Sequence, residues 1–216
     1  MAICQLFFQN LQNHIDILFV ETSILVVYNV NMAMEMRRYQ QKDRENCRDI
    51  CHKTATAPKY VKCKELVCLL YCDYYLDNEP DNIFILADEE DNAIGYILCG
   101  QDEKAYRKAI KPYLQKARKI SFVDGIMPII ESAMAKGLSK EYPAHLHIDI
   151  LPQGQRQGYG AKLIQALEVH LKEKGVQGLR LGVGGDNAGA HKFYEACGFT
   201  LLKNYGNLGR VYGKKL

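Results

Sequence analysis

The chain has 216 residues, of which 48% are hydrophobic, a length and composition that allow one domain with a full core and a short appendage. Its 28 basic and 25 acidic residues give a net charge of +3, which is too balanced to indicate nucleic-acid binding. The eight cysteines show neither zinc-ligand spacing nor a useful disulfide pattern, so we expect no metal, and free thiols in a reducing cytoplasm.

The first 33 residues differ in composition from the rest, since they contain no lysine or arginine, the first of which is Arg37. The apolar stretch Ile17–Val30 contains polar residues and has no basic segment before it, so it matches neither a membrane helix nor a signal peptide. We therefore expect no membrane partner, and interpret residues 1–33 as an extension of uncertain order before a domain spanning residues 34–216. The alternative is an extra strand or a homodimer contact made by Ile24–Tyr28.

Residues 34–99 show an orderly alternation of strand and helix patterns. The hydrophobic periodicity predicts two helices, the second rich in cysteine and tyrosine. Two later apolar runs flank the dipeptide Asp91-Asn92, which is typical of a β-hairpin turn. In chain order we expect a strand over Met34–Tyr39, helices over Asp43–Ala55 and Tyr60–Leu76, and strands over Asn82–Ala87 and Ala93–Cys99.

Residues 101–143 form a predicted helical insertion, with helices over Glu103–Lys119 and Gly125–Leu138. The stretch from Gln101 to Lys119 holds seven basic and two acidic residues. Such a charge run is most often a solvated helix face. The alternative is a lid over an acceptor cleft, or a surface that helps to bind an anionic ligand.

The segment from Ala144 to Lys174 has the order strand, glycine-bearing turn, helix. Ala144–Leu151 alternates, with His145, His147 and Asp149 on one face, and Pro152 ends the strand. The turn Gln155–Gly160 precedes a helix predicted over Ala161–Lys174. Backbone N–H groups at such a turn and the helix dipole converge on one point, which favours a bound phosphate. The turn is neither a Walker A loop nor a dinucleotide fingerprint.

Two motifs in the correct order resemble those of the GNAT superfamily of N-acetyltransferases. The first is the turn, which has the pattern Q/R-x-x-G-x-G/A as Gln155-x-x-Gly158-x-Gly160. The second follows a strand predicted over Gly178–Gly184 and reads Asn-x-x-Ala-x-x-Phe-Tyr-Glu-x-x-Gly-Phe from Asn187 to Phe199. The stretch HLHIDILP also resembles bacterial GNAT proteins related to the acetyltransferase-like domain of O-GlcNAcases.

The resemblance implies an α/β (α+β) fold of the GNAT type, with a mixed, mostly antiparallel central sheet that is splayed at its fourth and fifth strands and flanked by helices. The cosubstrate acetyl-CoA would lie in the V between the strands Leu146–Leu151 and Leu179–Gly184, and no metal is implied. The residues that would contact it are Ile150 and Leu151 through their backbone, Arg156, Gln157, Gly158, Tyr159, Gly160 and Ala161 at the pyrophosphate, and Asn187 and Phe193 along the pantetheine arm.

Three side chains are candidates for catalysis. Tyr194 occupies the position that commonly protonates the leaving thiolate in this family, although a packing tyrosine is the plainer interpretation. His147 and Asp149 are candidates for the general base that deprotonates the acceptor. The position of the family's frequent glutamate falls on Ala144, whose side chain has the other parity, so a bulge would be needed to restore it. A structural polar stack or a water relay are the alternatives.

The sequence therefore predicts an acetyl-CoA-dependent N-acetyltransferase in which an amine attacks the thioester directly in a ternary complex. The acceptor would be a small-molecule or protein amine. A GNAT-like module that binds CoA without catalysis is the alternative. The presence of the turn, Asn187 and Tyr194 favours the enzyme.

Overall fold

The computed structural model describes residues 15–20, 23–28, 34–55 and 62–216. The chain divides into two units, Met1–Ala33 and Met34–Leu216. In the first, β1 (Ile15–Val20) pairs antiparallel with β2 (Ser23–Tyr28) in a sheet of two strands. Ile24–Tyr28 thus lies in a strand, although not in the sheet of the second unit. The other residues of the expected extension lie outside the described residues.

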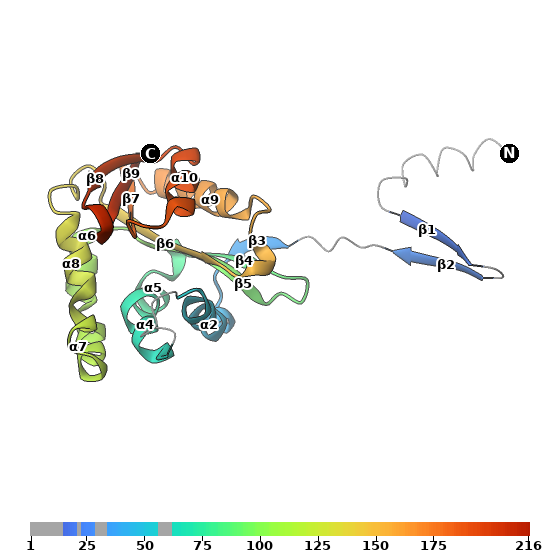
Figure 1. The fold of residues 1–216 in the computed structure, drawn as a ribbon, viewed down its shortest axis with the longest axis horizontal. Helices are drawn as coiled ribbons and strands as arrows, with labels where there is room; N and C mark the ends of the chain where they lie inside the picture. Colours follow the sequence, from blue (N-terminus) through green and yellow to red (C-terminus); the bar gives the residue numbers. More distant parts are fainter. Residues whose placement is uncertain (1–14, 21–22, 29–33, 56–61) are drawn as a thin grey trace. The chain divides into compact units, whose positions relative to one another are not determined.

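The second unit contains a seven-stranded sheet in the order β3-β4-β5-β6-β7-β9-β8 (Figure 1). Every neighbouring pair is antiparallel except β6 and β7, which are parallel and pair at only two positions, Ala144 with Leu179 and His145 with Arg180. This confirms the mixed, mostly antiparallel sheet that splays between its fourth and fifth strands. The strands are β3 (Glu35–Arg38), β4 (Phe84–Ala87), β5 (Ala93–Gly100), β6 (Ala144–Ile150), β7 (Gly178–Val183), β8 (Thr200–Asn204) and β9 (Arg210–Lys215).

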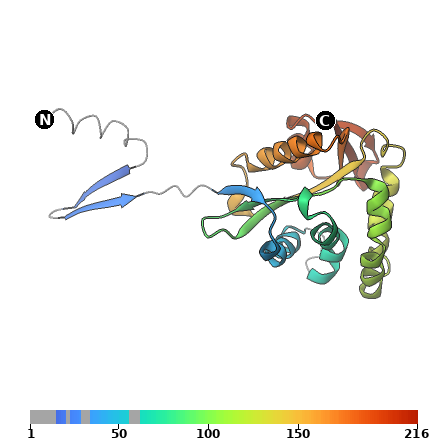
Figure 2. The ribbon, with the colours of Figure 1, turned by 180° about the vertical axis from the view of Figure 1, so that it is seen from behind.

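Helices cover both faces of this sheet, as Figures 1 and 2 show from opposite sides. On one face a core forms around the large buried side chains Tyr75 and Tyr96. The helices that contribute to this core are α2 (Arg44–Thr54), α4 (Lys64–Tyr71), α5 (Asp73–Asn78), α6 (Glu103–Ala109) and α7 (Lys111–Ile120).

The other face is covered by α9 (Tyr159–Glu173) and α10 (Ala188–Ala196). The apolar stripe that predicted α9 is fully buried here, because it packs on strand residues such as Leu179 and Tyr212. The remaining helix is α8 (Met127–Met134), and the short 3-10 turns are η1 (Gln41–Asp43), η2 (Pro80–Asn82), η3 (Asp124–Ile126), η4 (Pro152–Gly154) and η5 (Gly206–Leu208).

Two of the predicted helices are interrupted. The predicted helix Tyr60–Leu76 breaks at Cys72, whose φ of −131° and ψ of −59° leave the helical region, and its first two residues lie outside the described ones. The predicted helix Glu103–Lys119 breaks at Ile110, just before Pro112. Proline has no N–H for an intrahelical bond and is tolerated only in the first turn, so it begins α7 rather than continuing α6.

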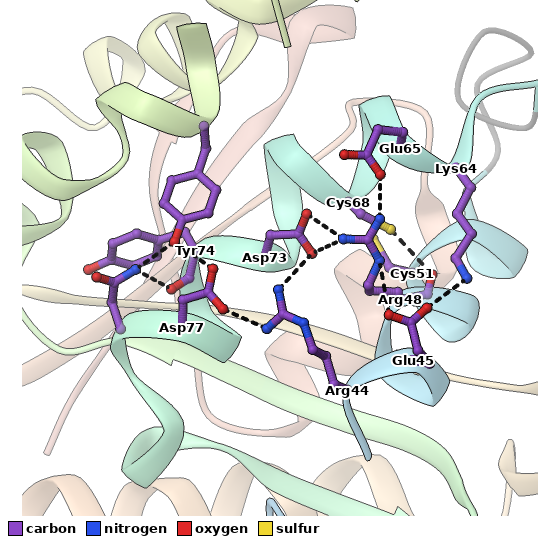
Figure 3. A network of polar contacts seen from close by, with 12 residues as sticks. Arg44, Glu45, Arg48, Cys51, Lys64, Glu65, Cys68, Asp73, Tyr74 and Asp77 are labelled. Atoms are coloured by element: carbon purple, nitrogen blue, oxygen red, sulfur yellow. Dashed lines mark hydrogen bonds and ion pairs between the residues drawn. The ribbon is translucent and has the colours of Figure 1, made fainter. Parts of the chain in front are cut away.

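A network of ion pairs ties α2 to α4 and α5 (Figure 3). Arg48 donates to both carboxylate oxygens of Asp73 at 2.7 Å, and Arg44 reaches Asp77 at 2.6 Å. Asp73 is only 3% exposed, and burial raises its pKa despite the two arginines. Breaking one partner of a buried pair costs about 3–5 kcal/mol, so this network holds the helical layer under β5 and β6 in place.

The described cysteines are all free, and most lie in the core around α2 and α4. Burial raises the pKa of Cys47 and Cys99, so these thiols stay protonated and behave as small apolar side chains. Within the ranges described, no helix is long and apolar enough to cross a membrane.

Candidate active site

The splay between β6 and β7 leaves a strand edge without a partner. Leu151 donates its N–H to the Ile94 carbonyl at 2.8 Å, so Leu151 is one of the β6-side residues whose backbone groups point toward β5. In an antiparallel ladder the alternate residues turn their backbone groups the other way. The backbone of Ile148 and Ile150 therefore faces β7, beyond the last paired residue, His145. Ile150 thus has the orientation that the sequence predicted for contact with a pantetheine arm, whereas the Leu151 N–H faces β5.

The turn before α9 presents a row of unpaired backbone donors. None of the N–H groups from Arg156 to Ala161 donates to a backbone carbonyl in the described chain, and the turn is exposed around Gly158. Gly158 has a φ of +83°, a conformation that glycine adopts without steric cost. Arg156 also has a positive φ, 59°. The turn and the first turn of the helix thus have backbone donors without a backbone acceptor, an arrangement that favours an anion.

Gly160 brings three elements together beside this turn. A Cβ at residue 160 would lie 3.0 Å from the ring of Phe193 on α10 and 3.8 Å from Ile150 on β6. The absence of a side chain at Gly160 therefore lets α9 approach the Phe193 ring closely. Two motifs that are separate in the sequence meet here, on the α9 face of the gap.

Asn187 starts α10 as its N-cap. Its Oδ1 accepts the Ala190 N–H at 3.0 Å, which leaves the Nδ2 group as the donor that a ligand could use. At the other end, Gly198 has a φ of +82° and the Phe199 N–H bonds to the Tyr194 carbonyl at 3.0 Å, a glycine-terminated C-cap. The motif thus sets the length of α10 and the position of Tyr194.

Tyr194 is half-buried, with its ring against Phe193 and Phe199 at centroid distances of 5.1 and 5.8 Å. Burial, and to a lesser extent the negative charge of Asp149, raises the pKa of its phenol. The hydroxyl is therefore protonated at neutral pH, as a proton donor must be. Its ring packing also fits the plainer structural role.

The polar residues of β6 lie on the face away from α9. The pairing of β6 with β5 has no register shift, so no bulge moves Ala144 from its fully buried position in the α9-side core. Asp149 accepts the Tyr96 hydroxyl at 2.6 Å, and burial raises its pKa. Burial lowers the pKa of His147 to about 4, so its ring is neutral at pH 7. Among the described residues, no group of His, Cys, Asp and Glu is placed to hold a metal ion.

A pocket of about 320 Å³ opens beside this strand edge. Its lining includes Leu146 and His147 of β6 and the segment Leu181–Gly184 at the end of β7, so it borders the gap where the strands separate. The lining also includes residues of α8, which belongs to the helical insertion, and Leu208–Val211 before and in β9. The remaining lining side chains include Tyr71, Tyr75, Glu103, Tyr106, Glu131, His145 and Arg180.

A buried ion pair stiffens the deep end of the pocket. Arg180, 4% exposed, bonds to Glu103 and donates to the Tyr142 carbonyl at 2.6 Å. His145 lies beside this pair, with its Nε2 2.9 Å from the Tyr75 hydroxyl and its Nδ1 3.7 Å from Glu103. Burial lowers the pKa of His145 well below its usual value, so it too is neutral.

Glu131 is a pocket residue that the sequence analysis did not select. It lies on α8, and its Oε1 accepts the Tyr71 hydroxyl at 3.0 Å. Its side chain borders the pocket and is accessible there, yet protein surrounds it on most sides, and this burial raises its pKa to about 7. The only signal in the sequence is a single carboxylate inside the apolar segment MPIIESAM.

Comparison with known proteins gives a consistent result. The model of the acetyltransferase (GNAT) family matches residues 45–199. The crystal structure of SsHAT superposes with a TM-score of 0.75 at 25% identity, covering 85% of this chain and 98% of that one. Polyamine N-acetyltransferase of Drosophila melanogaster gives 0.58 at 14% identity, covering 85% and 100% of the two chains. PaiA N-acetyltransferase of Thermoplasma acidophilum, in complex with coenzyme A, gives 0.56 at 16% identity, covering 85% and 99%.

Proposed function

Since this chain belongs to the GNAT family of acetyltransferases, we propose that it transfers an acetyl group from acetyl-CoA to a primary amine by direct attack in a ternary complex. The observation that carries the proposal is the unpaired edge of β6 beyond His145, which lies between an anion-binding turn and a pocket. A long cofactor with a diphosphate at one end and a thioester at the other fits this arrangement.

The cofactor would bind through backbone groups more than through side chains. The pyrophosphate would accept N–H groups from Arg156, Gln157, Gly158, Tyr159, Gly160 and Ala161, with the exposed Arg156 side chain adding a charge. The pantetheine amides would pair with the free edge at Ile150, where the carbonyl already accepts Gln155 at 2.7 Å. The Leu151 carbonyl accepts the Gly154 N–H at 2.9 Å, so the Ile150 N–H is the backbone group that would pair with the cofactor. Asn187 and Phe193 would line the other side.

The chemistry needs a proton acceptor for the amine and a proton donor for the sulfur. We assign the donor role to Tyr194, whose raised pKa keeps its hydroxyl protonated. On β6, His147 borders the pocket and so supports the base role better than Asp149, which is bonded to Tyr96 and does not line the pocket. The pocket volume of about 320 Å³ suits a small-molecule acceptor.

The test combines binding and turnover. We expect calorimetry to detect coenzyme A binding, and a thiol-release assay with a panel of primary amines to detect acetyl transfer. Tyr194→Phe should lower kcat by about 10²-fold or more while leaving the Kd for coenzyme A unchanged, because the phenol acts only when sulfur leaves.

Three outcomes would count against the proposal. Absence of any heat on titration with coenzyme A would refute the cofactor site. Binding without thiol release for any amine would favour the non-catalytic module. Full activity in Tyr194→Phe would leave the enzyme in place but remove Tyr194 as the acid.

A further inference from the structure

We propose that Glu131, held by Tyr71 in the wall of the pocket, binds the ammonium group of the acceptor and accepts its proton before acetyl transfer. This assignment rests on the proposed function and adds to it the residue that recognises the acceptor. It also places the general base on α8, in the helical insertion, rather than on β6.

The geometry places Glu131 across the pocket from the strand edge. Tyr71 on α4 donates to Glu131 on α8 at 3.0 Å, and the Tyr71 ring meets His147 edge-on at 5.7 Å. His147 and Leu146 belong to β6 at the point where it leaves β7. An acceptor bound to Glu131 therefore has its nitrogen in the space next to the gap in which the thioester would lie.

The other charged groups of the pocket do not compete for an ammonium ion. Glu103 is already bonded to Arg180 and to Arg107, the latter at 2.6 Å. Arg210 also lines the pocket, and as a cation it would not bind an ammonium group. Among the pocket-lining residues that the structure describes, Glu131 is thus the carboxylate with no ion pair.

The acid–base properties favour Glu131 over the histidine. Burial lowers the pKa of His147 to about 4, so it would be a weak acceptor for an ammonium proton. Burial raises the pKa of Glu131 to about 7, near the value at which a general base works best in neutral solution. His145 is neutral for the same reason as His147, and contributes no charge.

The step balances as follows. The acceptor R–NH₃⁺ gives one proton to the Glu131 carboxylate, which passes it to solvent. The neutral nitrogen attacks the thioester carbon, the new N–C bond forms, and the C–S bond breaks. The leaving sulfur takes a proton from Tyr194, and the second proton lost from nitrogen restores that tyrosine. The net products are the amide, coenzyme A and one proton.

The same lining indicates the class of acceptor. Tyr71, Tyr75 and Tyr106 line the same pocket as the carboxylate, a setting that suits a cation on an apolar or aromatic body. We therefore expect a primary monoamine such as benzylamine to bind better than a neutral molecule of the same shape.

The first experiment compares wild type, Glu131→Gln and Glu141→Gln with benzylamine as acceptor. Glu141 is a matched control, an exposed carboxylate of the same insertion that does not line the pocket. In wild type and the control, kcat/KM should rise with pH through an inflection near the pKa of about 7. Glu131→Gln should lose this inflection and about 10²-fold or more of kcat/KM. Retained coenzyme A binding would show that the variant is folded.

A second experiment does not depend on turnover. In the complex with coenzyme A, NMR titration of the side-chain carboxyl carbons should show one glutamate titrating near neutrality, absent from Glu131→Gln. Benzylamine should bind at least 10-fold more weakly to Glu131→Gln than to wild type, while benzyl alcohol should not distinguish them.

The results separate the two proposals. Wild-type turnover with an unchanged pH profile in Glu131→Gln would overturn the role of Glu131 and leave the acetyltransferase intact. If wild type transfers acetyl to no amine but binds benzylamine in a Glu131-dependent way, the acetyltransferase proposal would fall and Glu131 would remain as an amine-binding residue. Equal benzylamine binding in Glu131→Gln and wild type would overturn the acceptor site in either case.

Discussion

At the scale of single residues, the candidate site contains polar groups whose pKa values are shifted by burial. His145, His147 and Asp149 share one face of β6, and all three have pKa values displaced toward their neutral forms. The alternation of the sequence predicted the shared face, because side chains along a strand point to opposite sides in turn. It did not predict that helices would cover that face and displace the three pKa values.

The buried histidines should make stability depend on pH. In the folded state the pKa of His147 is about 4, below its ordinary value near 6.5, so between these pH values the unfolded chain binds more protons. Stability is therefore highest above pH 6.5 and falls as pH drops toward 4, by up to about 1 kcal/mol per pH unit for this residue. Urea unfolding between pH 4.5 and 7.5 should show a smaller slope for His147→Gln. An unchanged slope would mean that His147 does not titrate differently in the two states.

At the scale of elements, the first turn of α9 meets Phe193 of α10 on one side of the gap. The turn before α9 supplies unpaired N–H groups, and the cap of α10 supplies Asn187, while Gly160 and Phe193 bring the two helices together. Each helix start is encoded locally, by glycine at the turn and asparagine at the cap. Their convergence depends on the sheet, since β6 and β7 set where each helix begins.

Asn187 has two roles that substitution can separate. Asn187→Ala should lower the free energy of unfolding by about 1 kcal/mol, because the Ala190 N–H loses its acceptor. Asn187→Ser keeps a capping oxygen and should restore most of that stability. Both variants lack the Nδ2 donor, so both should bind coenzyme A more weakly if that group contacts the cofactor. Calorimetry and urea unfolding measure the two effects. Full affinity in Asn187→Ser would restrict Asn187 to the cap.

At the scale of the whole molecule, one parallel pairing in an otherwise antiparallel sheet creates the site. β6 and β7 pair at only two positions and then separate, which frees the edge of β6 and opens the pocket beside it. The residues around the gap come from the insertion, from both GNAT motifs and from the last hairpin. The described strands of the first unit, β1 and β2, form a separate sheet.

We therefore propose that residues 34–216 form the acetyltransferase domain, with residues 101–143 as its helical insertion and residues 1–33 as a dispensable extension. A chain that begins at Met34 should bind coenzyme A with an unchanged Kd and unfold at a Tm within a few degrees of that of the full chain. Thermal unfolding and calorimetry on both forms test this. A large loss of either quantity would show that residues 1–33 stabilise the domain.

The sequence by itself determined the features that local chemistry encodes. The order of strands and helices, the glycine turn before α9, the cap at Asn187 and the C-cap at Gly198 each depend on residues within one or two helical turns. These features were sufficient to predict the family and the fold. The breaks at Cys72 and Ile110 divide two predicted helices but do not change the order of the elements.

Only the tertiary structure decided which side chains line the pocket. Tyr71 and Glu131 are 60 residues apart, carry no shared motif, and meet because α4 and α8 border the same pocket. The displaced pKa values of Glu131 and His147 likewise come from neighbours that are distant in sequence. Burial and pairing of polar groups are properties of the packed chain, so no local pattern could reveal them.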